Sequence, residues 1–384
     1  KTVSLELALL LQSLSIQIQN YLEIQLINMA QKKFNYYKIG KDFKPFLVAE
    51  MSGNHNGDLK RAKKIIFEAK KNGADAIKLQ TFTPTGMTIN SRKREFIVKS
   101  KIKKWNNRSL YDLYKESYLP WSFQEKLFKY AEKLGILIFS SVFDLESLEF
   151  LEKIKNPIYK ISSFEITDLN LIKNVAKKNK PIILSTGSAT DHEIKNAIKI
   201  IKKFSDNEFI LLKCTSIYPA EAKDINLKSI LTYKKRYNCE IGYSDHTIGS
   251  EFAIASIALG SVLVEKHFTI NSEKTVDSSF SANQEVLRNI SSGIKNIYNG
   301  LGSGKIELSK KEILKRRSKR SLFFARDLFP NHILTEEDII SRRPKIGIAS
   351  DKYFKIINKK IKKKVKQFQP IKLSCLINRN DRNS

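Results

Sequence analysis

The chain has 384 residues, of which 69 are Lys or Arg and 39 are Asp or Glu, so its formal net charge is +30 at pH 7. Hydrophobic residues make up 41% of the sequence, including 22 Phe and 14 Tyr, which is enough to fill a sizeable core and argues against wholesale disorder. The length suits two domains, or one large barrel with a small appendage.

The positive charge raises the possibility of nucleic-acid binding. The lysines, however, are spread along the whole sequence among many Ile and Asn residues, and the sequence contains no helix-turn-helix, zinc-finger or RNP-type signature. This distribution favours the attraction of an anionic small substrate, with neither nucleic acid nor membrane as a partner. A nucleic-acid-binding protein remains the alternative from another functional class.

Residues 1–28 are rich in Leu, Gln and Ser, and we expect them to form an N-terminal extension of unknown role. Their apolar stretch is too short and too interrupted to span a membrane, and it lacks the basic region and cleavage site of a signal peptide. The three cysteines, Cys214, Cys239 and Cys375, show neither a disulfide framework nor a zinc-type spacing. This usage is typical of a reducing cytoplasm, where we expect the protein to be located.

From Phe46 onward the chain repeats a short run of β-branched residues, a short polar segment and a helical pattern. Eight such runs predict strands: Phe46–Met51, Ala76–Phe82, Leu137–Val142, Ile158–Ser163, Pro181–Thr186, Phe209–Thr215, Glu240–His246 and Ser261–Phe268. Eight strand–helix units over about 250 residues predict a parallel (β/α)8 barrel within residues 29–300. A doubly wound open sheet is the alternative, but no Gly-x-Gly-x-x-Gly motif follows the first run.

Two parts of the sequence depart from this repeat. The long interval between the second and third runs predicts an inserted loop before Trp121, at the face where barrels build their sites. After the barrel, a Gly/Ser hinge and the basic run "KKEILKRRSKR" predict a linker over residues 301–317, where a solvated helix is favoured over a nucleic-acid-binding arm. Residues 318–376 predict a small, mainly β domain, followed by a tail over 377–384.

Polar residues gather at the carboxyl ends of the predicted strands, where barrels carry out chemistry. They are Glu50, Lys78, Gln80, Ser140, Ser141, Lys160, Ser162, Ser163, Ser185, Thr186, Lys213, Thr215, Ser216, Ser244, Asp245, His246, Glu265 and His267. Three of these ends carry a lysine, and an unpaired buried charge costs several kcal/mol. The lysines therefore predict a site for an anion with more than one negative charge, and phosphoenolpyruvate fits that demand.

His246 and His267 end neighbouring predicted strands, which lie about 4.8 Å apart in a sheet. Either histidine alone is more often a hydrogen-bonded core residue, but as a pair beside Asp245 and Glu265 they predict a shared divalent metal ion. Two nitrogen ligands leave positions open for water and substrate, as a catalytic ion requires. The remaining histidines are expected to be a structural or peripheral substrate contact (His55) and surface residues (His192 and His332).

Seven ordered motifs resemble the phosphoenolpyruvate-condensing nonulosonic (sialic) acid synthases: "AEMSGNHNGD", "AIKLQTF", "YKISSFEITD", "ILSTGSA", "LLKCTSIYP", "GYSDHT" and "VEKHFT". The resemblance extends from Phe46 to Leu376. It implies a (β/α)8 barrel joined to a C-terminal antifreeze-like (SAF) domain over residues 318–376, whose start resembles the block Arg320–Arg343. It also implies homodimers in which that domain covers the active site of the partner.

The resemblance also implies roles for individual residues. Glu50 would contact the reacting sugar as an acid/base, and His246 and His267 would hold a catalytic Mn²⁺ or Mg²⁺. The residues implied to bind phosphoenolpyruvate are Lys78, Ser141, Lys160, Ser163, Ser185 and Ser244. Those implied to line the sugar site are Gln80, Ser216, Tyr218 and Asp277, with Arg343 reaching across the dimer to the N-acyl group.

The stretch "KTVDSSFSA" bears on the identity of the sugar. Sialic and legionaminic acid synthases usually read Gly-Pro-Asp-His and then a Ser here, whereas this chain keeps Asp277 but has Ser278 in place of the His. The Asp-x-x-Phe-Ser pattern resembles the branch of the family that makes pseudaminic acid, and an apolar Phe280 suits a 6-deoxy sugar. Ser188 and "SANQEV" depart from the usual pattern, so legionaminic and N-acetylneuraminic acid synthases remain alternatives.

The reaction implied by the resemblance is an aldol-like condensation of phosphoenolpyruvate with 2,4-diacetamido-2,4,6-trideoxy-L-altrose, which gives pseudaminic acid and phosphate. The metal would polarise the sugar aldehyde, and the lysines would hold the phosphate and the carboxylate. Much of the catalysis is then expected to be positioning and electrostatics.

Overall fold

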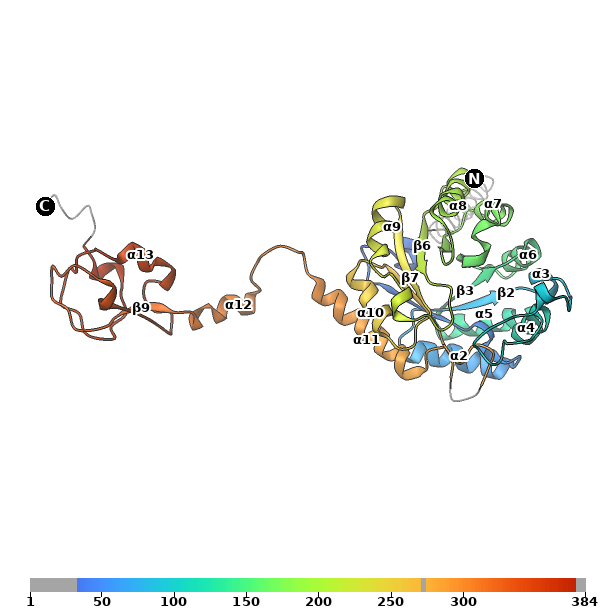
Figure 1. Cartoon of the computed structure of the whole chain (residues 1–384), viewed down its shortest axis with the longest axis horizontal. Helices are drawn as coiled ribbons and strands as arrows, with labels where there is room; N and C mark the ends of the chain where they lie inside the picture. Colours follow the sequence, from blue (N-terminus) through green and yellow to red (C-terminus); the bar gives the residue numbers. More distant parts are fainter. Residues whose placement is uncertain (1–32, 271–273, 378–384) are drawn as a thin grey trace, which may run out of the picture. The chain divides into compact units, whose positions relative to one another are not determined.

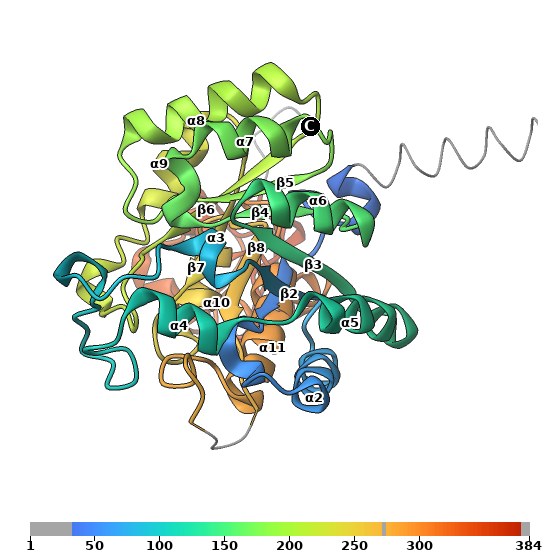
Figure 2. The same ribbon diagram turned by 90° about the vertical axis from the view of Figure 1, so that its right-hand side faces the viewer.

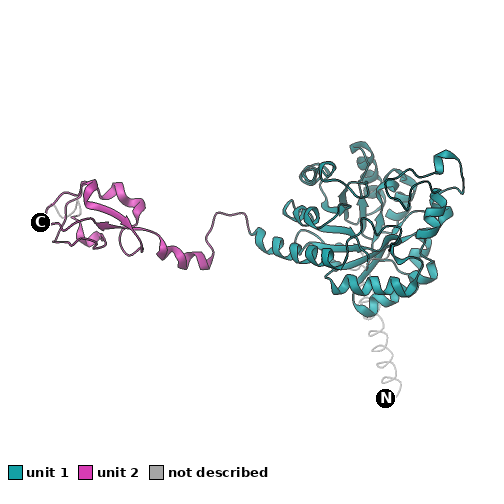
Figure 3. Ribbon diagram, turned by 60° about the horizontal axis from the view of Figure 1, so that its bottom comes forward, with its two compact units in different colours: residues 1–302 teal, residues 303–384 magenta. Residues whose placement is uncertain are grey.

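The computed structural model describes residues 33–270 and 274–377, so the expected extension over residues 1–28 lies outside the described part. The chain divides into two compact units, Lys1–Gly302 and Ser303–Ser384, which are coloured separately in Figure 3. The finer division expected from the sequence, with a linker over 301–317 and a tail over 377–384, stays a prediction.

The first unit is a closed barrel of eight parallel strands (Figure 1). The strands are β1 (Phe46–Glu50), β2 (Ala76–Thr81), β3 (Leu137–Val142), β4 (Tyr159–Ile161), β5 (Ile182–Ser185), β6 (Phe209–Cys214), β7 (Glu240–Asp245) and β8 (Leu263–His267). Closure comes from the pairing of β1 with β8, in which Glu50 lies opposite His267. The prediction of a (β/α)8 barrel is confirmed, and the open-sheet alternative is excluded.

Helices surround the strands (Figure 2). They are α2 (Leu59–Lys71), α5 (Trp121–Leu134), α6 (Leu145–Lys153), α7 (Leu169–Ala176), α8 (Asp191–Phe204), α9 (Ser229–Tyr237), α10 (Glu251–Ala258) and α11 (Gln284–Leu301). Local sequence sets their ends: the Thr190 side chain caps α8 in a capping box with Glu193, and Gly135 ends α5 at a φ of 65°. No helix within residues 33–270 and 274–377 combines the length and hydropathy that a membrane crossing requires.

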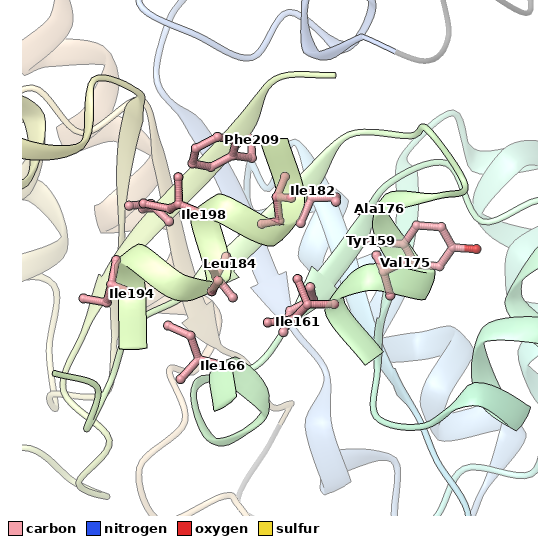
Figure 4. Packing of buried hydrophobic residues seen from close by; sticks show 14 of the residues in the cluster. Tyr159, Ile161, Ile166, Val175, Ala176, Ile182, Leu184, Ile194, Ile198 and Phe209 are labelled. Atoms are coloured by element: carbon pink, nitrogen blue, oxygen red, sulfur yellow. The ribbon is translucent and has the colours of Figure 1, made fainter. Parts of the chain in front are cut away.

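Alternate residues of each strand face opposite sides of the barrel wall. Outward-facing residues such as Tyr159, Ile161 and Leu184 pack against Val175 and Ile194 of the surrounding helices, as Figure 4 shows. Fully burying one such Ile or Leu side chain stabilises the fold by about 1.5–3 kcal/mol. The inward-facing apolar residues fill the barrel below its mouth: Val48, Ala76, Phe139, Ile158, Ile183, Ile210, Leu212 and Leu263.

The same alternation brings polar side chains inward at the carboxyl end of the barrel. Most of them lie two residues after an inward-facing apolar residue, as Lys160 follows Ile158 and Glu265 follows Leu263. The inward-facing polar residues are Glu50, Lys78, Gln80, Ser141, Lys160, Ser185, Cys214, Ser244, Glu265 and His267. The barrel is therefore apolar at its base and ionic at its mouth.

The interval between β2 and β3 forms the expected insertion, with two short helices, α3 (Pro84–Met87) and α4 (Leu110–Ser117). The second unit contains β9 (Ser321–Phe324) and β10 (Ile339–Arg342), paired antiparallel, together with α12 (Lys310–Lys315) and α13 (Tyr353–Ile356). It has its own core, which includes Leu322, Phe324, Leu334, Ile361 and Ile371.

Candidate active site

A cavity of about 630 Å³ opens at the carboxyl end of the barrel strands. It takes residues from the strands, from the loops that follow them and from the inserted segment. The sequence-predicted residues that line it are Lys78, Gln80, Lys160, Ser162, Ser163, Ser185, Tyr218, Ser244, His246, Glu265, His267, Asp277 and Phe280. Residues more than two hundred positions apart in the sequence therefore meet in one site.

Lys78, Lys160 and Glu265 form the ionic floor of the cavity, and Glu50 lies buried behind Lys78. Lys78 contacts the Glu50 carboxylate, donates a hydrogen bond to Ser141 Oγ at 3.0 Å, and lies 3.7 Å from Glu265 Oε2. The Lys160 ammonium lies 3.9 Å from Glu265 Oε1. Glu50 and Ser141 are fully buried behind Lys78 and do not line the cavity, so they act on it through the lysine.

Burial and ion pairing compete in setting the pKa values of this floor. Burial alone would lower the pKa of Lys78, but Glu265 and Glu50 outweigh it and raise that pKa. Burial would raise the pKa of Glu265, but Lys160 and Lys78 outweigh it, so this carboxyl stays ionised. For Glu50 and Lys160 burial prevails, which raises the pKa of the carboxyl and lowers that of the ammonium.

His246 and His267 lie together at the tips of β7 and β8, with ring centroids 5.3 Å apart. His246 Nδ1 lies 2.8 Å from the Thr215 carbonyl oxygen, which can only accept, so Nδ1 carries a proton and Nε2 is the nitrogen left for a metal. Burial would lower the pKa of His246, but Cys214 and the Thr215 carbonyl outweigh it and raise that pKa, so a metal would displace a proton from Nε2. Burial and the neighbouring His246 hold the pKa of His267 well below its usual range, which keeps that ring neutral. A neutral imidazole is the form that binds metal.

These residues fit a divalent cation. Within the described part of the chain, His267 Nδ1 and Glu265 Oε2 are buried polar atoms without a hydrogen-bond partner, as ligand atoms would be before a ligand binds. Imidazole nitrogens and carboxylate oxygens are donors that Mn²⁺ and Mg²⁺ accept. Among residues 33–270 and 274–377, no cluster of three or more His, Cys, Asp or Glu side chains suited to a metal occurs.

The segment after β8 supplies a further wall of the cavity through Val276, Asp277 and Phe280. Asp277 accepts hydrogen bonds at one oxygen, Oδ2, from Ser52 Oγ at 2.5 Å and from the Gly53 N–H at 3.0 Å. Phe280 is buried with its ring centroid 5.1 Å from that of His267. Ser278, which replaces the usual His, accepts a hydrogen bond from the Thr275 N–H at 3.0 Å and thereby closes a turn.

Several expectations from the sequence need correction. Lys213 and Asp245 end strands but face away from the barrel interior, because each stands at an outward-facing position of the alternation. Lys213 Nζ donates to the Cys214 carbonyl oxygen at 3.0 Å, and Asp245 pairs with Lys266 at 2.7 Å. Only two lysines, not three, therefore meet at the mouth.

Ser216 does not line the cavity, and Arg343 belongs to the second unit, so the sugar-binding role of each stays a prediction. Both ring nitrogens of His55 are engaged, with the Ser117 carbonyl at 3.2 Å and the Gly57 N–H at 2.9 Å, which favours a structural role. His332, expected at the surface, is only half-exposed, and its Nε2 lies 2.7 Å from Asp338 Oδ2.

Among the cavity residues that were not selected from the sequence as site residues are Glu165, Cys214 and Trp105. Glu165 lines the cavity, and burial raises the pKa of its carboxyl to about 7. Burial would raise the pKa of the Cys214 thiol, but the adjacent His246 outweighs it and lowers that pKa to about 7. Trp105 reaches the cavity from the inserted segment. The alternation after Leu212 could have identified Cys214, whereas Glu165 lies in a 3-10 turn (Ser163–Thr167) where no simple periodicity applies.

Comparison with known proteins places this site in a class. The sequence profile of the NeuB family matches residues 65–306, and the chain belongs to this family and is an enzyme. The pseudaminic acid synthase of Campylobacter jejuni is 40% identical over 325 residues, which cover 84% of this chain and 94% of that protein. The N,N'-diacetyllegionaminic acid synthase of the same species is 33% identical over 334 residues, covering 86% and 99%.

A solved structure shares the fold. The N-acetylneuraminic acid synthetase of Leptospira borgpetersenii, in complex with citrate, aligns with a TM-score of 0.65 at 33% identity. The alignment covers 73% of this chain and 94% of that one. The barrel is therefore common to relatives that are named for different nonulosonic acids.

Proposed function

We propose that the chain makes pseudaminic acid by condensing phosphoenolpyruvate with 2,4-diacetamido-2,4,6-trideoxy-L-altrose, with release of phosphate. The observation that carries the proposal is the meeting of Lys78, Lys160, His246 and His267 in one cavity. The choice of sugar is supported by the higher identity to a pseudaminic acid synthase, 40% against 33% for a legionaminic acid synthase. It is also supported by the buried Phe280 in the cavity wall, where a methyl group is better accommodated than a hydroxymethyl group.

The ionic floor is suited to phosphoenolpyruvate. Lys78 and Lys160 would face its phosphate and carboxylate, and hydroxyl groups of Ser163 and Ser244 line the same part of the cavity. Ser185 Oγ is buried without a hydrogen-bond partner among the described residues, so its hydroxyl is available to the substrate. Because these groups are already fixed by the barrel, binding requires little reorganisation, and their contribution is positioning and charge stabilisation.

His246 and His267 would hold Mn²⁺ or Mg²⁺, which when bound supplies a Lewis acid for the aldehyde oxygen of the sugar. The protein determines which ring nitrogen is offered: the Thr215 carbonyl fixes the tautomer of His246. In the condensation a carbon–carbon bond forms between the methylene carbon of phosphoenolpyruvate and the aldehyde carbon. Water then adds to the enol carbon and gives up one proton, which balances the proton taken up by the former aldehyde oxygen. The carbon–oxygen bond to phosphate breaks as the new hydroxyl loses its proton, which leaves a keto group and hydrogen phosphate.

Glu165 is the stronger candidate for the group that takes the proton from this water. It lines the cavity, and a carboxyl whose pKa is raised to about 7 by burial exchanges protons near neutral pH. The acid/base role of Glu50 stays a prediction, because its Oε1 accepts the Ser52 N–H at 2.8 Å and its other oxygen contacts Lys78. Both carboxyls can be tested separately by replacement with Gln.

The second unit is proposed to be an antifreeze-like (SAF) domain that covers the active site of a partner in a homodimer. Its sequence block Arg320–Arg343 supports this, as do exposed aromatic side chains such as Phe354 and Phe368, which are 84% and 63% exposed in the single chain. Arg343→Ala and His267→Ala chains would each be inactive alone. Their mixture should regain activity if Arg343 acts across the dimer, and should stay inactive if it acts within its own chain.

A cytoplasmic location is proposed on the chemistry of the thiols. The described residues include Cys214, Cys239 and Cys375, and all three are free. Free thiols are usual where glutathione and thioredoxin keep cysteines reduced. Location of the tagged chain by fractionation would test this.

The decisive experiment for the proposed function measures phosphate release from phosphoenolpyruvate with Mn²⁺ and each candidate sugar. The 6-deoxy altro sugar should give the highest kcat/KM. A higher value with N-acetylmannosamine, the hydroxymethyl sugar of manno configuration, would refute the assignment of the sugar but leave the reaction type intact.

A further inference from the structure

Trp105 lies in the insertion between β2 and β3 and joins the aromatic wall of the cavity. Its ring centroid is 5.7 Å from that of Phe280 and 5.8 Å from that of Tyr218. The Tyr218 ring in turn lies 4.9 Å from Phe280 and 4.2 Å from His246. One continuous aromatic surface therefore leads from the metal-binding histidines to the inserted segment.

Hydrogen bonds to the segment after β8 and within the insertion hold the indole in place. Its Nε1–H donates to the Val276 carbonyl oxygen at 3.0 Å, next to Asp277. Lys104 donates to the Lys274 carbonyl oxygen at 2.6 Å, so two neighbouring residues fasten the insertion to the segment after β8. Within the insertion, the Val98 N–H and the Arg108 carbonyl are bonded at 2.8 Å. A side chain fixed in this way is preorganised for recognition.

The distances match the length of a six-carbon sugar. The aldehyde carbon must lie beside the histidines, and five carbon–carbon bonds extend about 6 Å. The ring centroid of Phe280 lies 5.1 Å from that of His267, and the ring of Trp105 contacts Phe280 with a centroid distance of 5.7 Å. A sugar that lies along this aromatic surface, with its aldehyde at the histidines, would direct its opposite end toward Phe280 and Trp105.

We propose that Trp105 is a specificity-determining residue that contacts the 6-deoxy end of the sugar; this inference rests on the proposed function. The indole has one polar atom, and the Val276 carbonyl already uses it. A hydroxyl group at the end of the sugar would lose its water there and find no partner on the indole, whereas a methyl group would be well packed. The insertion thus selects the sugar without taking part in the reaction.

The test uses the full chain with Trp105→Ala, Trp105→Phe and the control Trp121→Phe. The sequence contains only these two tryptophans, and Trp121 stacks on Phe150 at 4.6 Å outside the cavity. Each variant is assayed with phosphoenolpyruvate and either 2,4-diacetamido-2,4,6-trideoxy-L-altrose or the same sugar with a hydroxymethyl group. Thermal unfolding shows whether each variant is folded.

Trp105→Ala should raise the KM for the 6-deoxy sugar at least about tenfold and reduce the preference over the hydroxymethyl sugar by a similar factor. The KM for phosphoenolpyruvate should stay within about twofold, Trp105→Phe should show a smaller loss, and Trp121→Phe should behave like the wild type. An equal loss with both sugars, or an equal rise of both KM values, would mean that Trp105 is only structural. A wild type that prefers the hydroxymethyl sugar would instead refute the proposed function, whatever Trp105 does.

Discussion

The two halves of the cavity are built in different ways. The half proposed for phosphoenolpyruvate consists of side chains on barrel strands, such as Lys78 on β2, Lys160 on β4 and Ser185 on β5, whose directions follow from strand alternation. The half proposed for the sugar consists of Trp105 and Phe280 on segments outside the strands, held by single hydrogen bonds and ring contacts. The residues proposed for catalysis are therefore fixed by the barrel strands, whereas the residues that face the sugar can change without disturbing those strands.

The largest effect is expected at the tips of β7 and β8. His246→Ala or His267→Ala should lower kcat at least about a thousandfold, because the Lewis acid supplies several kcal/mol of charge stabilisation. Circular dichroism should show an intact fold, and calorimetric titration should show the loss of Mn²⁺ binding. Near-normal wild-type activity in metal-free buffer with excess chelator would contradict the metal role.

The next prediction concerns what holds these two tips together. Asp245 and Lys266 lie opposite each other on β7 and β8, and their side chains pair at 2.7 Å, fully buried behind the histidines. Lys266→Met would leave the Asp245 carboxylate buried and unpaired, which should lower the free energy of unfolding of the barrel by about 3–5 kcal/mol. Urea unfolding measures this loss.

The exposed pair of Lys195 and Asp191, at 2.8 Å, provides the matched control. Lys195→Met should have a much smaller effect, because exposed ion pairs contribute little to stability. Equal losses for the two variants would show that the buried pair does not brace the strands.

A third prediction concerns the transfer of a proton from water to Glu165. Because burial raises the pKa of the Glu165 carboxyl to about 7, this group is ionised above that pH and protonated below it. If it takes a proton from water, wild-type kcat/KM should fall as the pH drops below about 7, and Glu165→Gln should lose about 10²–10⁴-fold in rate together with this dependence.

Glu152→Gln serves as its control. Glu152 lies outside the cavity and bonds to Tyr159 and Lys180, so its replacement should leave the pH profile unchanged. A Glu165→Gln enzyme with the wild-type profile would assign the proton transfer to another group.

The smallest effects separate the two halves directly. Ser185→Ala should raise the KM for phosphoenolpyruvate about three- to tenfold through the loss of one hydrogen bond, and leave the KM for the sugar unchanged. Phe280→Ala should do the reverse, with about a tenfold rise in the KM for the sugar. If either variant shifted both KM values equally, the two halves would not be independent.

The sequence allowed much of the strand half to be predicted. The barrel follows from eight repeated units, and the positions of Lys78, Lys160 and His267 follow from the rule that barrels act at their carboxyl ends. The errors at Lys213 and Asp245 arose because a residue at the end of a strand was equated with one that faces inward. Because alternate residues of a strand face the same side, the inward-facing Leu212 predicts that Cys214, and not Lys213, faces the barrel interior.

The loop half could not be predicted in the same way. The position of Trp105 depends on its bond to Val276, which is distant in the sequence, and no local pattern encodes such a contact. Phe280 was identified only through a resemblance, and Glu165 lies in a short 3-10 turn. Loops are positioned by tertiary contacts, so their residues are found only when the fold is known.

The arrangement at β7 and β8 limits how these strands can change. In each of them an outward-facing partner of the buried ion pair comes directly before a histidine that lines the cavity. Inserting or deleting a single residue in either strand would reverse every side chain beyond it, turning a histidine toward the helices and a charged group into the mouth. Substitutions can therefore accumulate here, but changes of length in either strand would remove both the brace and the metal ligand in one step.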